Sequence, residues 1–302
     1  MANMKRWILR IFAGLLGVIV VAVAAIYFLS SSRLNEKFTI APESVAIPTD
    51  SASLAYGEHV ATIRGCNGCH ARNLAGGTFI DAPVIARLWA RNLTPGKGGA
   101  GSSYTDTDWI RAIRHGVRPD GTALLFMPAQ EFNELSDHDL GTVIAYLKSR
   151  APVDTAYPAN KVGPLGRILF LTGALPLVPA EMINHTAARQ PEVPPGETVA
   201  YGGYLAGGCR GCHGTTFSGG KIPGTPPEML PARNLTPDDV SGIGKWSLED
   251  FRTAIRTGKL PGGVQLDTLS MPVPMTRHLT DLESAALFAY FKSLPAKAYG
   301  NR

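Results

Sequence analysis

The chain has 302 residues and a formal net charge of +5, with 29 Lys and Arg against 24 Asp and Glu. Residues 1–33 hold four of the basic residues and none of the acidic ones, so the rest of the chain is close to neutral. A neutral body lacks the basic surface that nucleic-acid binding needs, and we expect no nucleic-acid partner.

An apolar segment lies at the N-terminus. Residues 11–29 contain no charged side chain, three basic residues come before them, and Arg33 follows. Such a run is long enough to span a bilayer, and the preceding basic residues indicate that the N-terminus stays in the cytoplasm. Residues 22–24 would suit cleavage of a signal peptide, but the apolar run continues to Leu29. We therefore predict an uncleaved membrane anchor over residues 1–33.

Two copies of the pattern Cys-x-x-Cys-His use all four cysteines of the chain. This spacing is typical of c-type haem attachment. Two thiols one helical turn apart can add to the two vinyl groups of one haem, and the histidine offers a nitrogen to the iron. The sequence therefore predicts two covalent haem c groups, held by Cys66, Cys69 and His70 in the first copy and by Cys209, Cys212 and His213 in the second.

A Cys-x-x-Cys pair also has functions other than haem attachment. The pair can form a thioredoxin-like redox centre, half of a structural zinc site or a disulfide, and two pairs can share one zinc ion. A zinc site does not need a histidine directly after the second cysteine, and here both pairs have one. A redox pair normally occurs once, beside a βαβ pattern that this sequence lacks.

An internal repeat covers most of the chain. Cys66 maps onto Cys209 at an offset of 143 residues, and Met127 maps onto Met271 at an offset of 144. The sequence Arg-Asn-Leu-Thr-Pro at 91–95 also recurs at 233–237. One domain therefore occurs twice, and we place the copies at residues 48–152 and 195–298, with a linker over residues 153–194 between them.

Matching helix signals outline each copy. A helix is expected before each cysteine pair, over residues 52–64 and 198–208. Thr105 and Ser247 begin later helices with capping boxes in which Asp takes the third helical position, and Gly116 and Gly258 end them. Ser136 and Thr280 open the last helix of each copy. The predicted fold class is all-α: tandem helical bundles around one haem each, preceded by a transmembrane helix.

The linker carries an apolar segment between proline-rich flanks. Residues 165–178 are too short, and too interrupted by Arg167 and Pro176, to span a bilayer. We expect a short helix that packs between the two domains. Contact with the membrane surface or with a partner protein is the alternative.

On these motifs the chain resembles class I cytochromes c. That resemblance implies a methionine sulfur as the second axial ligand of each iron, at Met127 and Met271. Met275 competes with Met271, but Met127 and Met271 each lie nine residues before the cap of the last helix, which favours Met271. A histidine could instead supply the second axial ligand, but none of the five others, His59, His115, His138, His185 and His278, recurs at the repeat offset. We expect surface or capping roles for His59, His115 and His138, and His185 lies outside both domains. Arg91 and Arg233 do recur, as partners of a haem propionate or as solvated loop residues.

Two protein ligands on each iron leave no open position for a substrate, so we expect an electron carrier and not an enzyme. The chain is also similar to the cytochrome subunits of membrane-bound periplasmic dehydrogenases that oxidise alcohols, aldehydes or sugars, although those commonly carry three haems. The resemblance implies a single-pass protein of the bacterial inner membrane with its haem domains in the periplasm. It would relay electrons from a dehydrogenase or quinol-oxidising donor to a respiratory acceptor. A dihaem subunit of a cbb-type terminal oxidase and a dihaem peroxidase are the alternatives.

Overall fold

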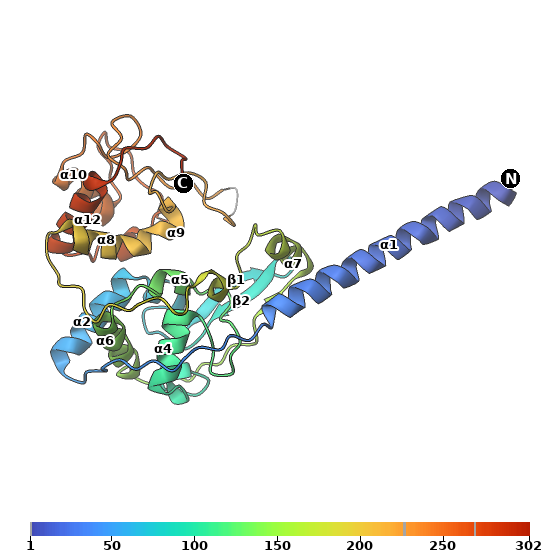
Figure 1. Ribbon diagram of the computed structural model, residues 1–302, viewed down its shortest axis with the longest axis horizontal. Helices are drawn as coiled ribbons and strands as arrows, with labels where there is room; N and C mark the ends of the chain where they lie inside the picture. The colour runs from blue at the N-terminus through green and yellow to red at the C-terminus, as the bar shows by residue number, and fades with distance from the viewer. Residues whose placement is uncertain (1, 226–227, 269) are drawn as a thin grey trace.

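The computed structural model describes residues 2–225, 228–268 and 270–302, so three positions of the expected second domain, 226, 227 and 269, lie outside the described residues. The helix α1 (Ala2–Leu34) projects from a body made of two helical halves, one stacked on the other (Figure 1). Each half has its own hydrophobic core.

The first half contains α2 (Ser51–Ile63), α3 (Cys66–His70), β1 (Gly77–Ala82), β2 (Ala86–Ala90), η1 (Ala100–Ser102), α4 (Asp106–His115), α5 (Ala129–Phe132) and α6 (Asp137–Lys148). The connection contains β3 (Lys161–Val162), α7 (Pro164–Leu171) and η2 (Pro179–Met182), and the second half contains α8 (Val199–Ala206), η3 (Gly207–Cys209), α9 (Arg210–His213), α10 (Leu248–Thr257), α11 (Val273–Thr276) and α12 (Asp281–Ser293).

The helices α4 and α10 begin and end where local sequence signals predicted. Thr105 and Ser247 each accept a hydrogen bond from the backbone of the third helical residue, whose Asp side chain accepts one from the cap backbone in return. The helices end at Gly116 and Gly258, with φ of 66° and 75°, a left-handed conformation that glycine adopts without a Cβ clash. Both predicted capping boxes are confirmed.

One helix crossing forms the centre of each half. Helix α2 packs against α6, and α8 packs against α12. At each crossing a glycine meets the backbone of the other helix: a Cβ at Gly57 would overlap the carbonyl oxygen of Thr142, and one at Gly202 would overlap that of Ala286. The absence of a side chain therefore lets both helix pairs approach closely, a role that the sequence reasoning did not assign to these glycines.

A small antiparallel sheet corrects the all-α prediction. β1 pairs with β2, and β2 pairs with β3, with Ala86 opposite Val162. β1 and β2 are short strands of mixed composition joined by a tight connection, and the two-residue β3 comes from the linker. The buried Leu88 packs in a third core cluster with Phe170 and Leu177. The chain is thus mostly helical, with strands that helical periodicity could not reveal.

The linker helix forms on the predicted segment but does not lie between the two halves. α7 packs against the C-terminal end of α1 and beside the sheet (Figure 1). Phe170, on its buried face, lies in the core cluster that also contacts Leu34 of α1. The helix itself is therefore packed at the foot of α1, whereas the end of the predicted segment reaches the second half, where Ala174 and Pro176 lie against Gly224.

Polar contacts join the two halves. His59 lies 2.8 Å from Glu283, and the Arg210 guanidinium lies 2.8 Å from a carboxylate oxygen of Glu134. The Tyr204 hydroxyl donates to the buried Asp139 carboxylate at 2.5 Å. These contacts place η3 and α9 beside α5, and α11 beside α2.

Candidate haem sites

The first cysteine motif forms a single helical turn, α3. It follows Gly65, whose φ of 79° reverses the chain after α2. The Nδ1 atom of His70 lies 2.7 Å from the carbonyl oxygen of Arg91. A carbonyl can only accept, so Nδ1 carries the proton and the lone pair of Nε2 remains for a metal ion.

The second motif repeats this arrangement. The Nδ1 atom of His213 lies 2.7 Å from the carbonyl oxygen of Arg233. The backbone after each histidine turns in the same way: Gly76 donates to the carbonyl of His70 at 2.9 Å, and Gly219 donates to that of His213 at 3.0 Å. Each ligand histidine predicted from the sequence thus has its tautomer fixed by a carbonyl some twenty residues further along the chain.

None of the four cysteines is paired in a disulfide. Burial raises the pKa of Cys66 and of Cys209 to about 12, and it also raises the pKa of Cys69 and Cys212. All four are therefore neutral thiols near pH 7, whereas the thiolate is the form that attacks a disulfide or binds zinc. Within residues 2–225, 228–268 and 270–302, no group of three or more His, Cys, Asp or Glu side chains is arranged to hold a metal ion.

Burial also sets the protonation of the two motif histidines. It lowers the pKa of His70 and His213, while the hydrogen bond to the carbonyl raises it in part. Both imidazoles are consequently neutral near pH 7. Neutral imidazole is the form that ligates a metal.

The candidate methionines occupy equivalent turns. The carbonyl of Met127 accepts a hydrogen bond from the amide of Ala129 at 2.7 Å, and the carbonyl of Met271 accepts one from Val273 at 2.7 Å. A proline follows each methionine with nearly the same backbone angles and caps the next short helix. Met127 packs against the core of the first half.

Met275 lies elsewhere. Its sulfur is 2.8 Å from the position that a Cβ on Gly65 would take, so it contacts the residue that precedes the first cysteine motif. Glu131, which corresponds to Met275 at the repeat offset of 144, makes the reciprocal contact. Its carboxylate lies where a Cβ on Gly211 would be, inside the second motif. Each half therefore reaches the cysteine motif of the other through an equivalent position.

Arg91 and Arg233 act through their backbones. Their carbonyls hold the two histidines, while the guanidinium of Arg91 donates to the carbonyl of Tyr157 at 2.5 Å. The next residue in each loop is a buried asparagine: the side-chain nitrogen of Asn92 donates to the carbonyl of Val153 at 2.6 Å, and that of Asn234 to the carbonyl of Lys297 at 2.7 Å. The recurrence of Arg-Asn in the sequence signalled a repeated loop, but it did not reveal that the two arginine carbonyls accept hydrogen bonds from the motif histidines.

Two other histidines depart from their expected surface or capping roles. His115 is fully buried, with Nδ1 2.9 Å from His185 and Nε2 3.0 Å from Glu43. His59 is half-buried in the contact with Glu283 between the halves. The side chain of His138 is 49% exposed, in agreement with a surface role.

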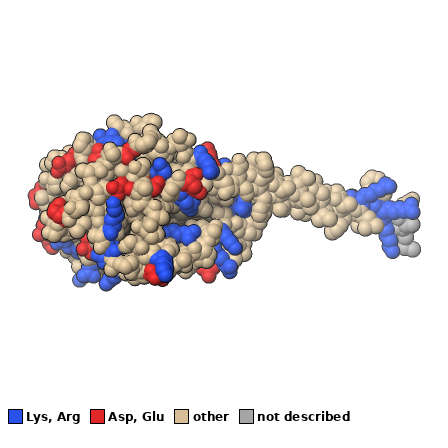
Figure 2. Space-filling model, turned by 90° about the horizontal axis from the view of Figure 1, so that it is seen from below, with Lys and Arg blue, Asp and Glu red and all other residues tan. Residues whose placement is uncertain are grey.

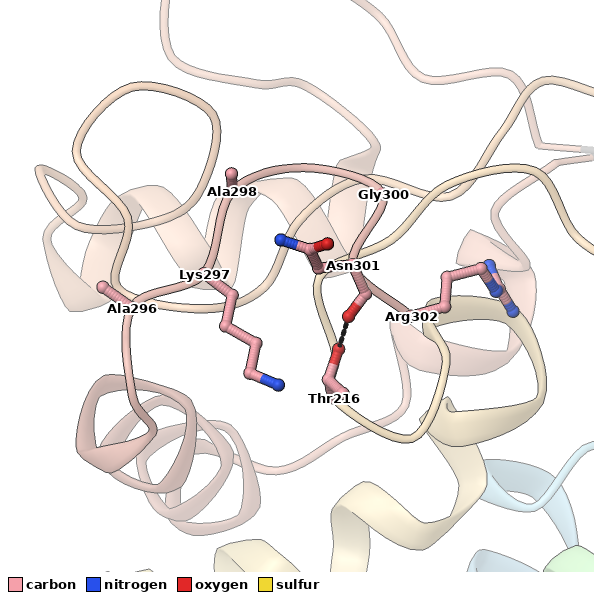
Figure 3. Close-up of a pocket in the computed structure, with 7 residues that line it drawn as sticks. All are labelled: Thr216, Ala296, Lys297, Ala298, Gly300, Asn301 and Arg302. Carbon is pink, nitrogen blue, oxygen red and sulfur yellow. Dashed lines mark hydrogen bonds between the residues drawn. The ribbon is translucent and has the colours of Figure 1, made fainter.

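The C-terminal segment lies over the second motif. The guanidinium of Arg302 donates to the carbonyl of Cys212 at 2.8 Å. Beside it, Thr216 and residues 296–298 and 300–302 line an open hollow of about 670 Å³, into which the side chain of Lys297 extends (Figure 3). The hollow is polar and adjoins the second motif without including its cysteines.

Comparison with known proteins matches part of the sequence to a family model. Residues 52–147 fit the family model of cytochrome c oxidase, cbb3-type, subunit III. Residues 52–147 form a cytochrome c domain. The matched range contains α2, the first cysteine motif and α6, whose crossing and histidine orientation are described above.

Relatives named as cytochromes or cytochrome subunits extend the similarity beyond residues 52–147. The chain is 29% identical over 281 residues to the cytochrome c subunit of a quinone alcohol dehydrogenase from Gluconobacter oxydans, covering 83% of the chain and 56% of the relative. It is 27% identical over 272 residues to the fructose dehydrogenase cytochrome subunit from Gluconobacter japonicus, covering 82% of the chain and 53% of the relative. A dihaem cytochrome c-type protein from Cereibacter sphaeroides is 25% identical over 291 residues, covering 84% of the chain and 90% of the relative. The chain thus spans little more than half the length of the two dehydrogenase subunits.

Proposed function

We propose that this protein is a membrane-anchored dihaem cytochrome c that transfers electrons as the cytochrome subunit of a periplasmic dehydrogenase. The observation that carries the proposal is the repeated hydrogen bond from the Nδ1 atom of a motif histidine to the carbonyl of Arg91 or Arg233. It gives both motifs a neutral imidazole whose Nε2 atom can bind a metal, beside two cysteines that form no disulfide. A covalently bound haem c would supply one-electron exchange between iron(III) and iron(II) at each motif.

The chain's residues have the following proposed roles. Cys66 and Cys69 attach the first haem, with His70 and Met127 as its iron ligands. The second haem is attached and ligated by Cys209, Cys212, His213 and Met271. Arg91 and Arg233 orient the histidines through their carbonyls, and the propionate role of their guanidinium groups stays a prediction. The cytochrome c domains would occupy residues 48–152 and 195–298, with residues 153–194 as the linker.

Contacts between the halves support electron exchange between the two sites. Arg64, two residues before Cys66, has its guanidinium 5.1 Å from the ring centroid of Tyr204 and donates to the carbonyl of Leu205 at 3.3 Å. Both partners lie a few residues before Cys209. The two attachment motifs are therefore held on facing surfaces of one interface.

The N-terminal helix supports a membrane location. Residues 3–34 form one helix long and apolar enough to span a bilayer. Figure 2 shows its shaft without charged side chains between a basic cluster at the tip and the body. The basic tip favours a cytoplasmic N-terminus and a periplasmic body in the inner membrane. The mass of the purified chain tests whether the anchor is retained, because cleavage after Ala24 would remove most of it.

The similarity to relatives supports the choice of donor. The alcohol and fructose dehydrogenase cytochrome subunits match more than four fifths of this chain. We therefore propose a dehydrogenase as the electron donor and a respiratory component as the acceptor. Copurification of a quinoprotein or flavoprotein with the tagged chain is the expected result.

An absorption spectrum with a haem assay tests the core of the proposal. We expect two covalent haems per polypeptide, both low-spin, with the far-red band of sulfur-ligated iron(III) at an intensity for two haems. A single haem per chain would overturn the dihaem proposal. One high-spin haem would indicate a vacant or exchangeable sixth position and would favour a dihaem peroxidase.

The family model favours a second candidate. Its description names subunit III of a cbb3-type oxidase, and it matches 52–147 of this chain. A dihaem subunit of a terminal oxidase would share the anchor and the paired motifs. Copurification with an oxygen-reducing subunit, and not with a dehydrogenase, would establish this alternative.

A further inference from the structure

A short apolar surface lies at the foot of α1. On α7, Leu165 and Ile168 are 41% and 43% exposed, and their spacing of three residues places them on one face of the helix. Val84, in the turn between β1 and β2, is 59% exposed, and its carbonyl accepts a hydrogen bond from the amide of Leu165 at 3.0 Å. We call Val84, Leu165 and Ile168 the apolar rim.

Contacts with α1 fix the position of the apolar rim along the axis of that helix. The guanidinium of Arg167 donates to the hydroxyls of Ser30 and Ser31 at 2.7 and 2.9 Å. It also lies 4.6 Å from the ring centroid of Tyr27. These three partners lie at the end of the uncharged run 11–29. The helix α7 is therefore held beside the point at which the apolar part of α1 ends.

We propose that the apolar rim rests in the headgroup region of the lipid bilayer. This inference rests on the proposed anchoring by α1. Nineteen residues at about 1.5 Å rise extend for about 28 Å, close to the thickness of the hydrocarbon core. The hydrocarbon boundary then falls near Leu29, and α7 lies at the level of the lipid headgroups.

The chemistry of α7 suits that position. Arg167 is its only charged residue and is turned toward α1, so the exposed face carries no charge. Tyrosine and arginine at this level match the preference of amphipathic side chains for the membrane interface. Figure 1 shows α7 on the side of the body from which α1 emerges. With a second membrane contact, the first half would be held at a fixed orientation to the bilayer and would not swing about a single helix.

Photo-crosslinking to lipid tests the rim. The full-length, haem-loaded chain is placed in nanodiscs of phosphatidylethanolamine and phosphatidylglycerol. The photoreactive residue p-benzoylphenylalanine replaces Ile168 in one variant, Val20 of α1 in a second and Val240 in a third. Val240 is 95% exposed in the second half and serves as a matched control for an exposed apolar position away from α1.

The three positions separate the two proposals. We expect lipid adducts at positions 20 and 168, each several-fold above position 240. Adducts at 20 with only control levels at 168 would overturn the rim proposal and leave the anchor intact. Absence of adducts at 20 would overturn the anchor, and with it the rim. Crosslinking of position 168 to a copurifying protein, with no lipid adduct, would identify the rim as a protein interface and would also overturn the proposal.

Discussion

At the residue scale, backbone carbonyls orient the histidine of each Cys-x-x-Cys-His motif. The histidine orientation depends on a carbonyl, and the loop that carries the carbonyl depends on a buried asparagine. The Cys-x-x-Cys-His spacing could be recognised in the sequence because covalent attachment needs those side chains in that order. The accepting carbonyls could not be recognised, since every residue has one and only the fold selects which is used.

The methionine turn gives the first prediction. Met271→Ala should remove half of the far-red sulfur–iron band and let one haem bind an added ligand such as imidazole. The reason is that Met271 occupies a turn equivalent to that of Met127 in the other half. Met275→Ala should leave the band unchanged, since that sulfur contacts Gly65. Spectra of the two oxidised variants check this. Loss of the band in Met275→Ala alone would show that the repeat alignment of this loop is wrong.

A buried carboxyl gives the second prediction. Burial raises the pKa of Glu131 from 4.5 to about 7, against a smaller lowering by Arg64. Between pH 4.5 and about 7, the folded chain therefore binds more protons than the unfolded chain. The contribution of the Glu131 carboxyl to the free energy of unfolding is complete below about pH 4.5 and is lost as the pH rises through 7. The melting temperature of Glu131→Gln should therefore fall less than that of the wild type as the pH rises from 5 to 8. An unchanged difference in melting temperature between variant and wild type from pH 5 to 8 would contradict the assignment.

At the element scale, local signals and tertiary contacts differ in how well they can be predicted. The caps at Thr105 and Ser247 depend on residues three positions apart, and the sequence predicted both. The strands were missed because two short runs pair with a third from the linker, seventy residues later. The position of α7 was also missed, because its apolar face suits either a domain interface or the foot of α1, and periodicity alone does not choose between them.

The helix crossings give the third prediction. Gly202→Ala should destabilise the second half by about 1–3 kcal/mol or more, because the new Cβ overlaps the carbonyl of Ala286 and forces α8 and α12 apart. Denaturant unfolding measures this effect. Gly196→Ala is the matched control, since a Cβ there meets only the Thr198 methyl at 3.5 Å. Equal stability of the two variants would show that the crossing tolerates a side chain.

At the scale of the whole molecule, one carboxylate joins the halves. Asp139 accepts from Tyr56 within the first half at 2.9 Å and from Tyr204 of the second half at 2.5 Å. Burial and the nearby carboxylate raise the pKa of Tyr204 to about 12, so its hydroxyl remains a donor over the physiological range.

This carboxylate gives the fourth prediction. A double-mutant cycle of Tyr204→Phe with Asp139→Asn should show a coupling of about 1.5–3 kcal/mol, as expected for a hydrogen bond to a charged group. Calorimetry should also show the two halves unfolding at more separate temperatures in Tyr204→Phe. Tyr56→Phe is the control, since it removes a bond to the same carboxylate without crossing the interface. Additive free energies for Tyr204 and Asp139 would mean that the bond does not couple the halves.

The reciprocal contacts of Met275 with Gly65 and of Glu131 with Gly211 have an evolutionary consequence. Equivalent positions of the two repeated units each touch the other unit near its cysteine motif, at places three residues apart in the repeat alignment, which approximates the arrangement of an isologous homodimer with twofold symmetry. A single-domain ancestor with this surface would have paired with a second copy of itself. Fusion of the two genes would then have allowed the same position to become acidic in one copy and a thioether in the other, a divergence that identical subunits cannot undergo.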